Sequence, residues 1–226
     1  LELVKYPIVR GVLSKILFVV FCILGALFGL ETGPAAFDWV ITALGDATDV
    51  LVGAWKPLGC IMVETAKILF AGDELNHNVL VPLGTNETLS KSAYYLMETN
   101  PGPGLSVLLA ALIGGPSAAR SASPIAMLVV LVGGIHEVYF PYVYMMPYLI
   151  FPLILSAASG ILVFDAFEVG LTQLPTPPSI MGFVNVTPRG DATGIVFGML
   201  VSLFVSLVLT WILIYGPVRF LKRLVR

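Results

Sequence analysis

The sequence predicts an all-α, polytopic membrane protein with broken and re-entrant helices. Hydrophobic residues make up 58% of the 226 residues, charged residues only 12%, and the mean hydropathy is +0.95. A soluble domain carries about 25% charged residues, so this chain has too few to build a polar surface. Lipid is therefore the expected solvent for much of it. The net charge of −2 gives no reason to expect a nucleic acid partner.

Two apolar segments are long enough to be considered as membrane spans. Residues 192–215 hold no ionisable side chain except Tyr215, and residues 11–30 contain a second apolar run from 16 to 30. About 20 apolar residues cross the hydrocarbon core of a bilayer. Basic residues precede the first run and follow the last, which places both chain ends on the cytoplasmic side. This favours an even number of membrane crossings. Re-entrant segments, which enter and leave on the same side, do not add to that number.

The segments after the first run are shorter and more mixed. Residues 35–55 combine three aspartates and two tryptophans with apolar residues, a pattern typical of an amphipathic helix at the membrane interface. Residues 57–71 are apolar but contain Glu64 and Lys67, which lie three positions apart on one helix face and are expected to pair. A polar connection is expected from residue 72 to about residue 100.

Prolines and glycines interrupt the rest of the chain. NPGPG at 100–104 cannot continue a helix, and GGP at 114–116 ends the apolar run that follows, before a small-residue loop that carries Arg120. Residues 125–164 include three prolines and cannot form one straight helix, and residues 174–190 are expected to be a loop or hairpin. Irregular backbone at membrane depth is tolerated only where it is buried or lines a cavity, as in transporters.

Within residues 125–164, only His136 and Glu137 are ionisable near neutral pH. A carboxylate within an apolar stretch costs roughly several kcal/mol unless it is paired or neutralised, and it usually marks a substrate or ion path. A polyhydroxylated substrate would supply the hydroxyl donors that such a carboxylate lacks. The alternative is a structural Glu137, satisfied by Arg120 or by backbone amides.

Two further polar groups are candidates for ligand contacts. Asn76 and His77 stand together, and Glu98 and Asn100 precede a chain reversal; both sets can serve a ligand or only satisfy backbone groups. No metal is expected, because the second histidine of a zincin motif would have to stand where Phe140 is. No phosphate loop or CxxC motif indicates a cofactor. The two cysteines, Cys22 and Cys60, are expected to be buried small hydrophobes.

Several motifs, in a fixed order over residues 60–200, resemble the mannitol-type permease of the bacterial phosphotransferase system, its enzyme IIC component. They are VETAKILF at 63–70, LNH at 75–77, PLG at 82–84, LMETNPGPG at 96–104, GGIHEVYFPYV at 133–143, PPSI at 177–180 and TPRG at 187–190. The most specific of them is the one at 133–143. Residues 1–226 are then one membrane-embedded IIC-like domain that lacks the family's N-terminal helices.

The resemblance implies a homodimeric permease of the bacterial inner membrane that binds a sugar alcohol and presents it to the cytoplasm. There an enzyme IIB partner would donate a phosphoryl group from a phosphocysteine, a residue that this chain does not supply. The resemblance implies substrate contacts by residues of three motifs: Glu137, His136, Asn76, His77, Glu98 and Asn100. Glu137 is also the implied acceptor of the proton from the reacting hydroxyl.

The chain departs from the family pattern at two places. Asp73 and Glu74 stand where an asparagine pair is expected, and Met146 replaces an asparagine before Pro147. These departures leave the identity of the sugar alcohol open. The lack of the family's N-terminal helices and the change at 72–74 support a second interpretation, a facilitator, sensor or inactive half-permease on the same scaffold that carries out no phosphorylation. 

Overall fold

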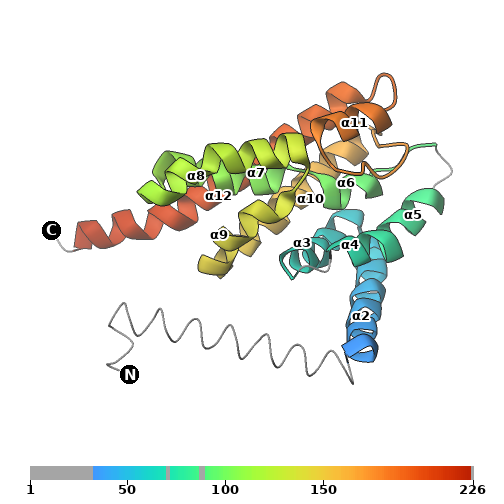
Figure 1. The fold of residues 1–226 in the computed structure, drawn as a ribbon, viewed down its shortest axis with the longest axis horizontal. Helices are drawn as coiled ribbons and strands as arrows, with labels where there is room; N and C mark the ends of the chain where they lie inside the picture. The colour runs from blue at the N-terminus through green and yellow to red at the C-terminus, as the bar shows by residue number, and fades with distance from the viewer. Residues whose placement is uncertain (1–32, 70–71, 87–89, 225–226) are drawn as a thin grey trace. The chain divides into compact units, whose positions relative to one another are not determined.

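The computed structural model describes residues 33–69, 72–86 and 90–224 (Figure 1). The chain divides into two units, Leu1–Ala43 and Leu44–Arg226. The predicted span at 16–30 lies outside the described residues. The described residues contain no β-strand, only an isolated bridge between Ser92 and Leu171. The predicted all-α class is therefore confirmed.

The helices of the described residues are short for the most part, and breaks at proline or glycine separate many of them. In chain order they are α2 (Gly33–Ala54), η2 (Lys56–Gly59), α3 (Cys60–Ile68), α4 (Gly72–Leu75), η3 (Asn76–Leu80), α5 (Val81–Asn86), α6 (Tyr94–Thr99), α7 (Gly102–Gly114), α8 (Ser117–Leu128), η4 (Val129–Gly133), η5 (His136–Tyr139), α9 (Phe140–Met145), η6 (Pro147–Leu149), α10 (Ile150–Ala166), α11 (Ile180–Val186) and α12 (Ala192–Leu224).

Two of these helices are long and apolar enough to cross a membrane. They cover Pro147–Ala166, 20 residues, and Ala192–Leu213, 22 residues. The second agrees with the span predicted at 192–215. Other apolar segments are interrupted as predicted, with breaks after Thr99 and at Gly115, and a further break, which was not predicted, lies at Gly134. The stretch 125–164 is accordingly divided among several helices.

Two predictions about connecting segments were wrong. The stretch 72–100, expected as a polar connection, folds into α4, η3, α5 and α6. The residues around Arg120, expected as a loop, form α8. In addition, the predicted loop or hairpin at 174–190 contains the short helix α11, whose N-cap Ser179 accepts a hydrogen bond from the Gly182 amide at 3.2 Å.

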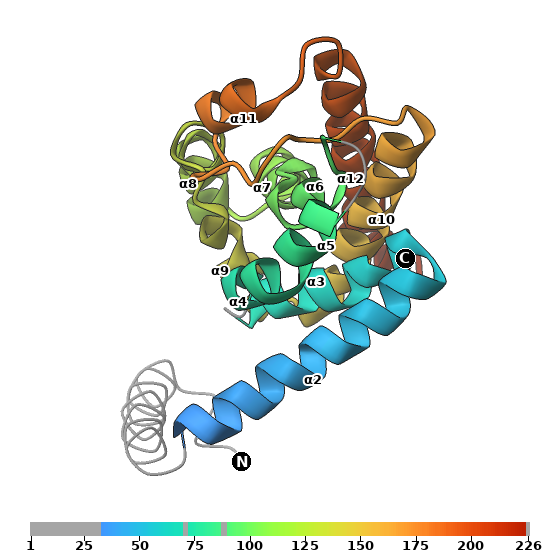
Figure 2. The same ribbon diagram turned by 90° about the vertical axis from the view of Figure 1, so that its right-hand side faces the viewer.

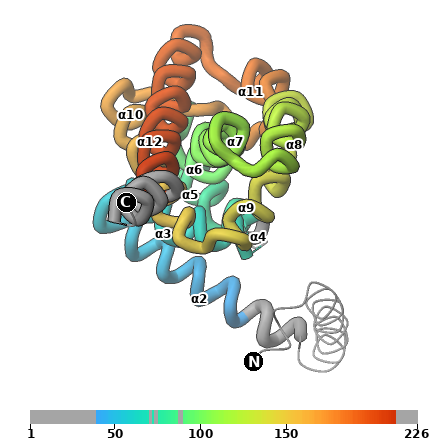
Figure 3. Tube along the Cα trace, turned by 90° about the vertical axis from the view of Figure 1, so that its left-hand side faces the viewer, coloured from blue at the N-terminus to red at the C-terminus, as the bar shows by residue number. Residues whose placement is uncertain are grey.

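A ridge of small residues on α12 lets three helices pack closely. Figure 3 shows α12 beside α10 and α7, and both pairs are in contact. Every fourth residue of α12 is small and buried: Gly194, Gly198, Ser202, Ser206 and Thr210. Small residues at this spacing allow helix backbones to approach within a membrane, where packing replaces the hydrophobic effect as the driving force.

Hydrogen bonds between the same helices reinforce this packing. The Ser156 hydroxyl of α10 donates to the Ser202 carbonyl at 2.6 Å, and the hydroxyls of Ser106 and Ser206 join α7 to α12. All four of these serines are fully buried. The Ser202 hydroxyl also accepts a hydrogen bond from the Asn100 side-chain nitrogen at 2.8 Å. These four buried serine hydroxyls therefore have partners, as their desolvation requires, whereas the Thr210 hydroxyl has none among the described residues.

We predict that Gly160→Ala destabilises the protein by about 1–3 kcal/mol, the usual cost of overpacking. A Cβ at Gly160 would lie 2.8 Å from the Asn100 side-chain nitrogen and would also meet the Ser202 hydroxyl. Gly53→Ala is the matched control, since a Cβ there has open space around it. Thermal unfolding of both variants in detergent tests this. Equal stability of Gly160→Ala and the parent would contradict the close packing of α10 and α12.

Candidate functional site: a buried polar cluster

Six polar side chains from α3, η3, α6 and η5 form one largely buried group, here called the polar cluster: Glu64, Lys67, Asn76, Glu98, His136 and Tyr139. Figure 2 shows α3, α4 and α6 close together, and α3 contacts both of the others. The cluster lies among apolar residues of the core, including Ile68, Leu105 and Phe140. Polar groups in such surroundings must find partners or remain unsatisfied.

Lys67 is the centre of the cluster. Its ammonium nitrogen lies 3.1 Å from Glu64 Oε1 and donates to the Glu98 carbonyl oxygen at 3.0 Å. The Asn76 side-chain amide donates to Glu98 Oε2 at 3.2 Å, so Glu98 links the lysine to η3. The predicted pairing of Glu64 and Lys67 is confirmed. Both side chains are buried, and a buried ion pair of this kind is stable only when further hydrogen bonds support the charges.

The cluster has unused hydrogen-bonding capacity. Three of its buried atoms, Glu64 Oε2, Asn76 Oδ1 and His136 Nε2, lack a partner among the described residues, and the Tyr139 hydroxyl beside Lys67 can still donate a hydrogen bond. Electrostatic interactions with Lys67 connect His136 and Tyr139 to the charged pair. Since most buried polar atoms in proteins are hydrogen-bonded, a concentration of unpaired atoms in one place is typical of a site that receives a ligand.

The backbone around His136 explains its position. Gly134 adopts a left-handed conformation, with φ of 71°, which glycine accepts readily. A Cβ at this position would lie 2.9 Å from backbone atoms of Pro178 and Ser179, so no side chain fits there. The His136 ring hydrogen-bonds to the backbone of Pro178, necessarily its carbonyl because proline has no N–H. Nε2 has no partner, so the bond uses Nδ1, and the neutral ring presents Nε2 as an acceptor.

Tyr139 reaches the cluster because of a second glycine. A Cβ at Gly104 would overlap the Tyr139 ring, so the glycine in the NPGPG segment of α7 leaves the space that this ring occupies. The ring also packs edge-on against Phe140, with the centroids 5.0 Å apart. Two motifs recognised in the sequence, at 96–104 and at 133–143, are therefore in direct contact here.

Three of the six predicted site residues come together, and three lie elsewhere. Asn76, Glu98 and His136 belong to the cluster. Asn100 is buried but occupied: its oxygen accepts from the Gly102 amide at 2.9 Å and its nitrogen donates to Ser202. His77 is exposed and lines a separate cavity. 

Glu137 is exposed, unlike its neighbour His136. Its expected setting within an apolar stretch is therefore not a buried one. Arg120 is also exposed, and no ion pair joins these two residues, both of which the structure describes. The proposed structural pairing of Glu137 with Arg120 is absent.

The sequence reasoning missed three members of the cluster, Glu64, Lys67 and Tyr139, as functional residues. Glu64 and Lys67 were interpreted as a helix pair alone. Their place in a short apolar segment is the signal that could have identified them. Charges in such a segment are costly, by the same argument that was applied to Glu137. Tyr139 gave no signal beyond its place in the motif at 133–143.

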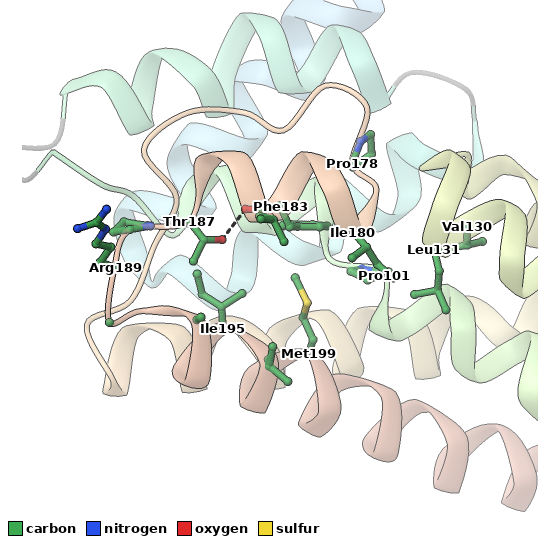
Figure 4. Close-up of a pocket in the computed structure, with 15 residues that line it drawn as sticks. Pro101, Val130, Leu131, Pro178, Ile180, Phe183, Thr187, Arg189, Ile195 and Met199 are labelled. Carbon is green, nitrogen blue, oxygen red and sulfur yellow. Dashed lines mark hydrogen bonds between the residues drawn. The ribbon is translucent and has the colours of Figure 1, made fainter.

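An apolar cavity of about 390 Å³ lies next to the segment that holds His136 (Figure 4). Pro178 is on its wall, with Pro101, Leu131 and Met199 among the other lining residues. Thr187 lies there as well, but its hydroxyl is occupied by the Phe183 carbonyl at 2.7 Å. Such a lining offers few hydrogen-bond partners to a polar ligand, and the polar cluster remains the better candidate site.

Interrupted apolar helices, two of them long enough to cross a membrane, define the class of the protein as a helical membrane protein. The relatives make this more specific. The chain is 40% identical over 188 residues to the mannitol-specific EIICB component of the phosphotransferase system of Halalkalibacterium halodurans, which covers 82% of the chain and 38% of that protein. It is 40% identical over 174 residues to the corresponding EIICB component of Bacillus subtilis, 76% of the chain and 36% of the relative.

A third relative is the mannitol-specific EIICBA component of Escherichia coli, 36% identical over 194 residues, or 85% of the chain and 30% of the relative. The chain belongs to the family of mannitol-type phosphotransferase system permeases, as an EIIC component. It spans about a third of the length of these relatives. No protein-family model matches it, and no solved structure does.

We predict that Lys67→Met lowers the stability by about 3–5 kcal/mol, because it leaves the Glu64 carboxylate buried without its partner. The double substitution Glu64→Gln with Lys67→Met removes both charges and recovers most of this loss. Thermal unfolding of the parent, both single variants and the double variant in detergent gives the coupling between the two residues. Additive effects of the single substitutions would show that the pair does not act as a unit.

Proposed function

We propose that this chain is the translocating part of a sugar-alcohol permease, and that its substrate is mannitol or a closely related hexitol. The support is the combination of family membership with the polar cluster. The relatives are named as mannitol-specific components of the phosphotransferase system. A hexitol carries a hydroxyl on every carbon, and each hydroxyl both donates and accepts hydrogen bonds.

The observation that carries the proposal is a set of four buried polar groups with free hydrogen-bonding capacity. Glu64 Oε2, Asn76 Oδ1 and His136 Nε2 are acceptors, and the Tyr139 hydroxyl both donates and accepts. Leaving such a group unsatisfied costs about 1–3 kcal/mol, and more for a charged one. A bound polyol would satisfy all four groups in surroundings that exclude water. The binding energy therefore comes from relieving the desolvation cost of these groups.

Translocation would proceed by alternating access around this site, with the broken segments at 99–102 and 133–136 as the elements that rearrange. The phosphoryl group would come from an EIIB partner, since the relatives are EIICB and EIICBA components and no phosphoryl donor is proposed in this chain. The chain's own residues would hold the substrate and orient the hydroxyl that reacts.

Glu137 is our proposal for the group that accepts the proton of the reacting hydroxyl. It follows His136 directly, and its exposure leaves it within reach of a partner domain. A carboxylate placed beside the hydroxyl in this way acts as a general base. His77 and Asn100 would contribute less directly, His77 by contacting the substrate outside the cluster and Asn100 by holding the start of α7.

We place the chain, residues 1–226, as one membrane-embedded domain of a homodimer in the bacterial cytoplasmic membrane, with both ends in the cytoplasm. Two apolar helices long enough to span a bilayer support the membrane location. The basic residues near both ends support the orientation, because positive charge is enriched in cytoplasmic segments.

We predict that Asn76→Ala weakens mannitol binding about tenfold or more, because one buried hydrogen bond of roughly 1.4 kcal/mol is lost. Asn78→Ala is the matched control, since Asn78 lies two residues along the same helix but is exposed. The measurement is equilibrium binding of radiolabelled mannitol to membranes that contain each variant. Parent-like affinity of Asn76→Ala, or an equal loss in Asn78→Ala, would remove the cluster as the binding site.

We predict that Glu137→Gln lowers the rate of mannitol phosphorylation by about 10²-fold, the usual contribution of a general base, while binding changes much less. The rate is measured with a phosphorylated EIIB domain from one of the relatives. Loss of binding in Glu137→Gln would instead assign it to substrate contact. Binding by the parent without any phosphorylation would favour the facilitator or sensor interpretation of this scaffold.

A further inference from the structure

A second, polar cavity of about 510 Å³ lies between η3, α5 and α6 on one side and the segment 173–186 on the other. The functional site described above does not include it. Its polar lining consists of His77, Thr85, Tyr95, Gln173, Thr176 and Asn185. The remaining wall is made by small and aliphatic residues, such as Val81 and Leu174.

The chemistry of this lining fits an uncharged, hydroxyl-rich molecule. No Asp, Glu, Lys or Arg is among its lining residues, so the cavity offers an ion no opposite charge. Amide and hydroxyl side chains can donate and accept at once, which matches the two-way hydrogen bonding of hydroxyl groups. Tyr95 adds an aromatic face, and Gly84 leaves room for it, because a Cβ there would lie 2.8 Å from the ring.

Most of these polar groups are unoccupied. Tyr95 and Thr85 share a hydrogen bond of 3.3 Å, whereas His77, Gln173, Thr176 and Asn185 have no side-chain hydrogen bond to any residue that the structure describes. The backbone beside Gln173 and Asn185 is nevertheless held in position, because hydrogen bonds join the residues next to them. The backbone N–H and the hydroxyl of Thr172 each donate to the Val186 carbonyl at 3.0 Å.

The two walls of the cavity lead directly to the polar cluster. On one wall, His77 follows Asn76, which donates to Glu98 within the cluster. Both residues belong to the π-helix η3, a rare element that occurs frequently at functional sites. On the other wall, Thr176 lies two residues before Pro178, whose carbonyl holds His136. On each wall, an exposed residue of the cavity, His77 or Thr176, therefore lies within two residues of one that contacts the polar cluster, Asn76 or Pro178.

We propose that this cavity is a vestibular binding site for a polyol, here called the vestibule, which holds the substrate before it enters the polar cluster. The inference rests on the proposed function, because the ligand is the same sugar alcohol. The vestibule binds it more weakly than the cluster, since its exposed groups exchange hydrogen bonds with water rather than replace missing ones. Four open side chains, His77, Gln173, Thr176 and Asn185, supply the contacts.

The test introduces a thiol into the vestibule by Asn185→Cys and follows its reaction with a hydrophilic maleimide in membranes containing the full chain. Met181→Cys is the matched control, because Met181 lies on the same helix, is 68% exposed and does not line the vestibule. The parent chain accounts for any reaction of Cys22 and Cys60. Mannitol is the probe, and an equal osmolarity of betaine controls for solvent effects.

At a mannitol concentration of roughly ten times its dissociation constant, we expect the reaction of Asn185→Cys to slow about tenfold, because only the unoccupied fraction reacts. The protection persists when Asn76→Ala is added to weaken the cluster, with the same half-saturating concentration. Met181→Cys is not protected. Protection that disappears with Asn76→Ala would mean that the thiol senses the cluster, and it would overturn the vestibule.

Binding of radiolabelled mannitol to the parent chain, measured in the same membranes, separates the two proposals. Binding by the parent without protection of Asn185→Cys leaves the proposed function in place and overturns the vestibule. Protection of Asn185→Cys with only weak binding that Asn76→Ala does not change supports the vestibule and removes the cluster as the main site. Neither binding nor protection overturns both.

Discussion

The buried contact of Lys67 with Glu64 and Glu98 is the constraint on which the candidate site depends. The Lys67 ammonium group, which is paired with Glu64 within α3, joins α3 to α6 through the Glu98 carbonyl, and the Glu98 carboxylate in turn holds η3 through Asn76. Because a charge in apolar surroundings is stable only with such partners, these three elements are fixed relative to one another. The positions of the unpaired atoms follow from this network.

The network itself needs a closely packed scaffold, and the small residues of α12 provide it. Ser202 accepts from Asn100, and Asn100 caps the break that starts α7. From that start, Gly104 leaves room for the ring of Tyr139. Packing between spanning helices, which lipid does not drive, thus determines where a hydroxyl of the polar cluster lies. The packing of the helices and the geometry of the site therefore depend on each other.

The sequence predicted the class, the main breaks and the Glu64–Lys67 pair, because proline, glycine and charge act locally. It could not predict the helices between residues 72 and 100, since short polar helices are stabilised by tertiary contacts rather than by propensity. Nor could it separate His136 from Glu137. In an apolar segment both the lipid-facing and the interior sides are hydrophobic, so no periodicity indicates which side is buried. The 3₁₀ geometry of η5, with three residues per turn, then directs these neighbours differently.

Two adjoining polar sites of different burial suit the physics of a hydrophilic substrate in a membrane protein. Each hydroxyl of a polyol must exchange water for protein, and an abrupt exchange would leave several groups unsatisfied at once, each at about 1–3 kcal/mol. The vestibule offers exposed amides and an imidazole that work alongside water, whereas the cluster offers buried groups without a partner among the described residues. Binding in steps also keeps any one site from holding the substrate too tightly to release it, a requirement that conduction and transport share.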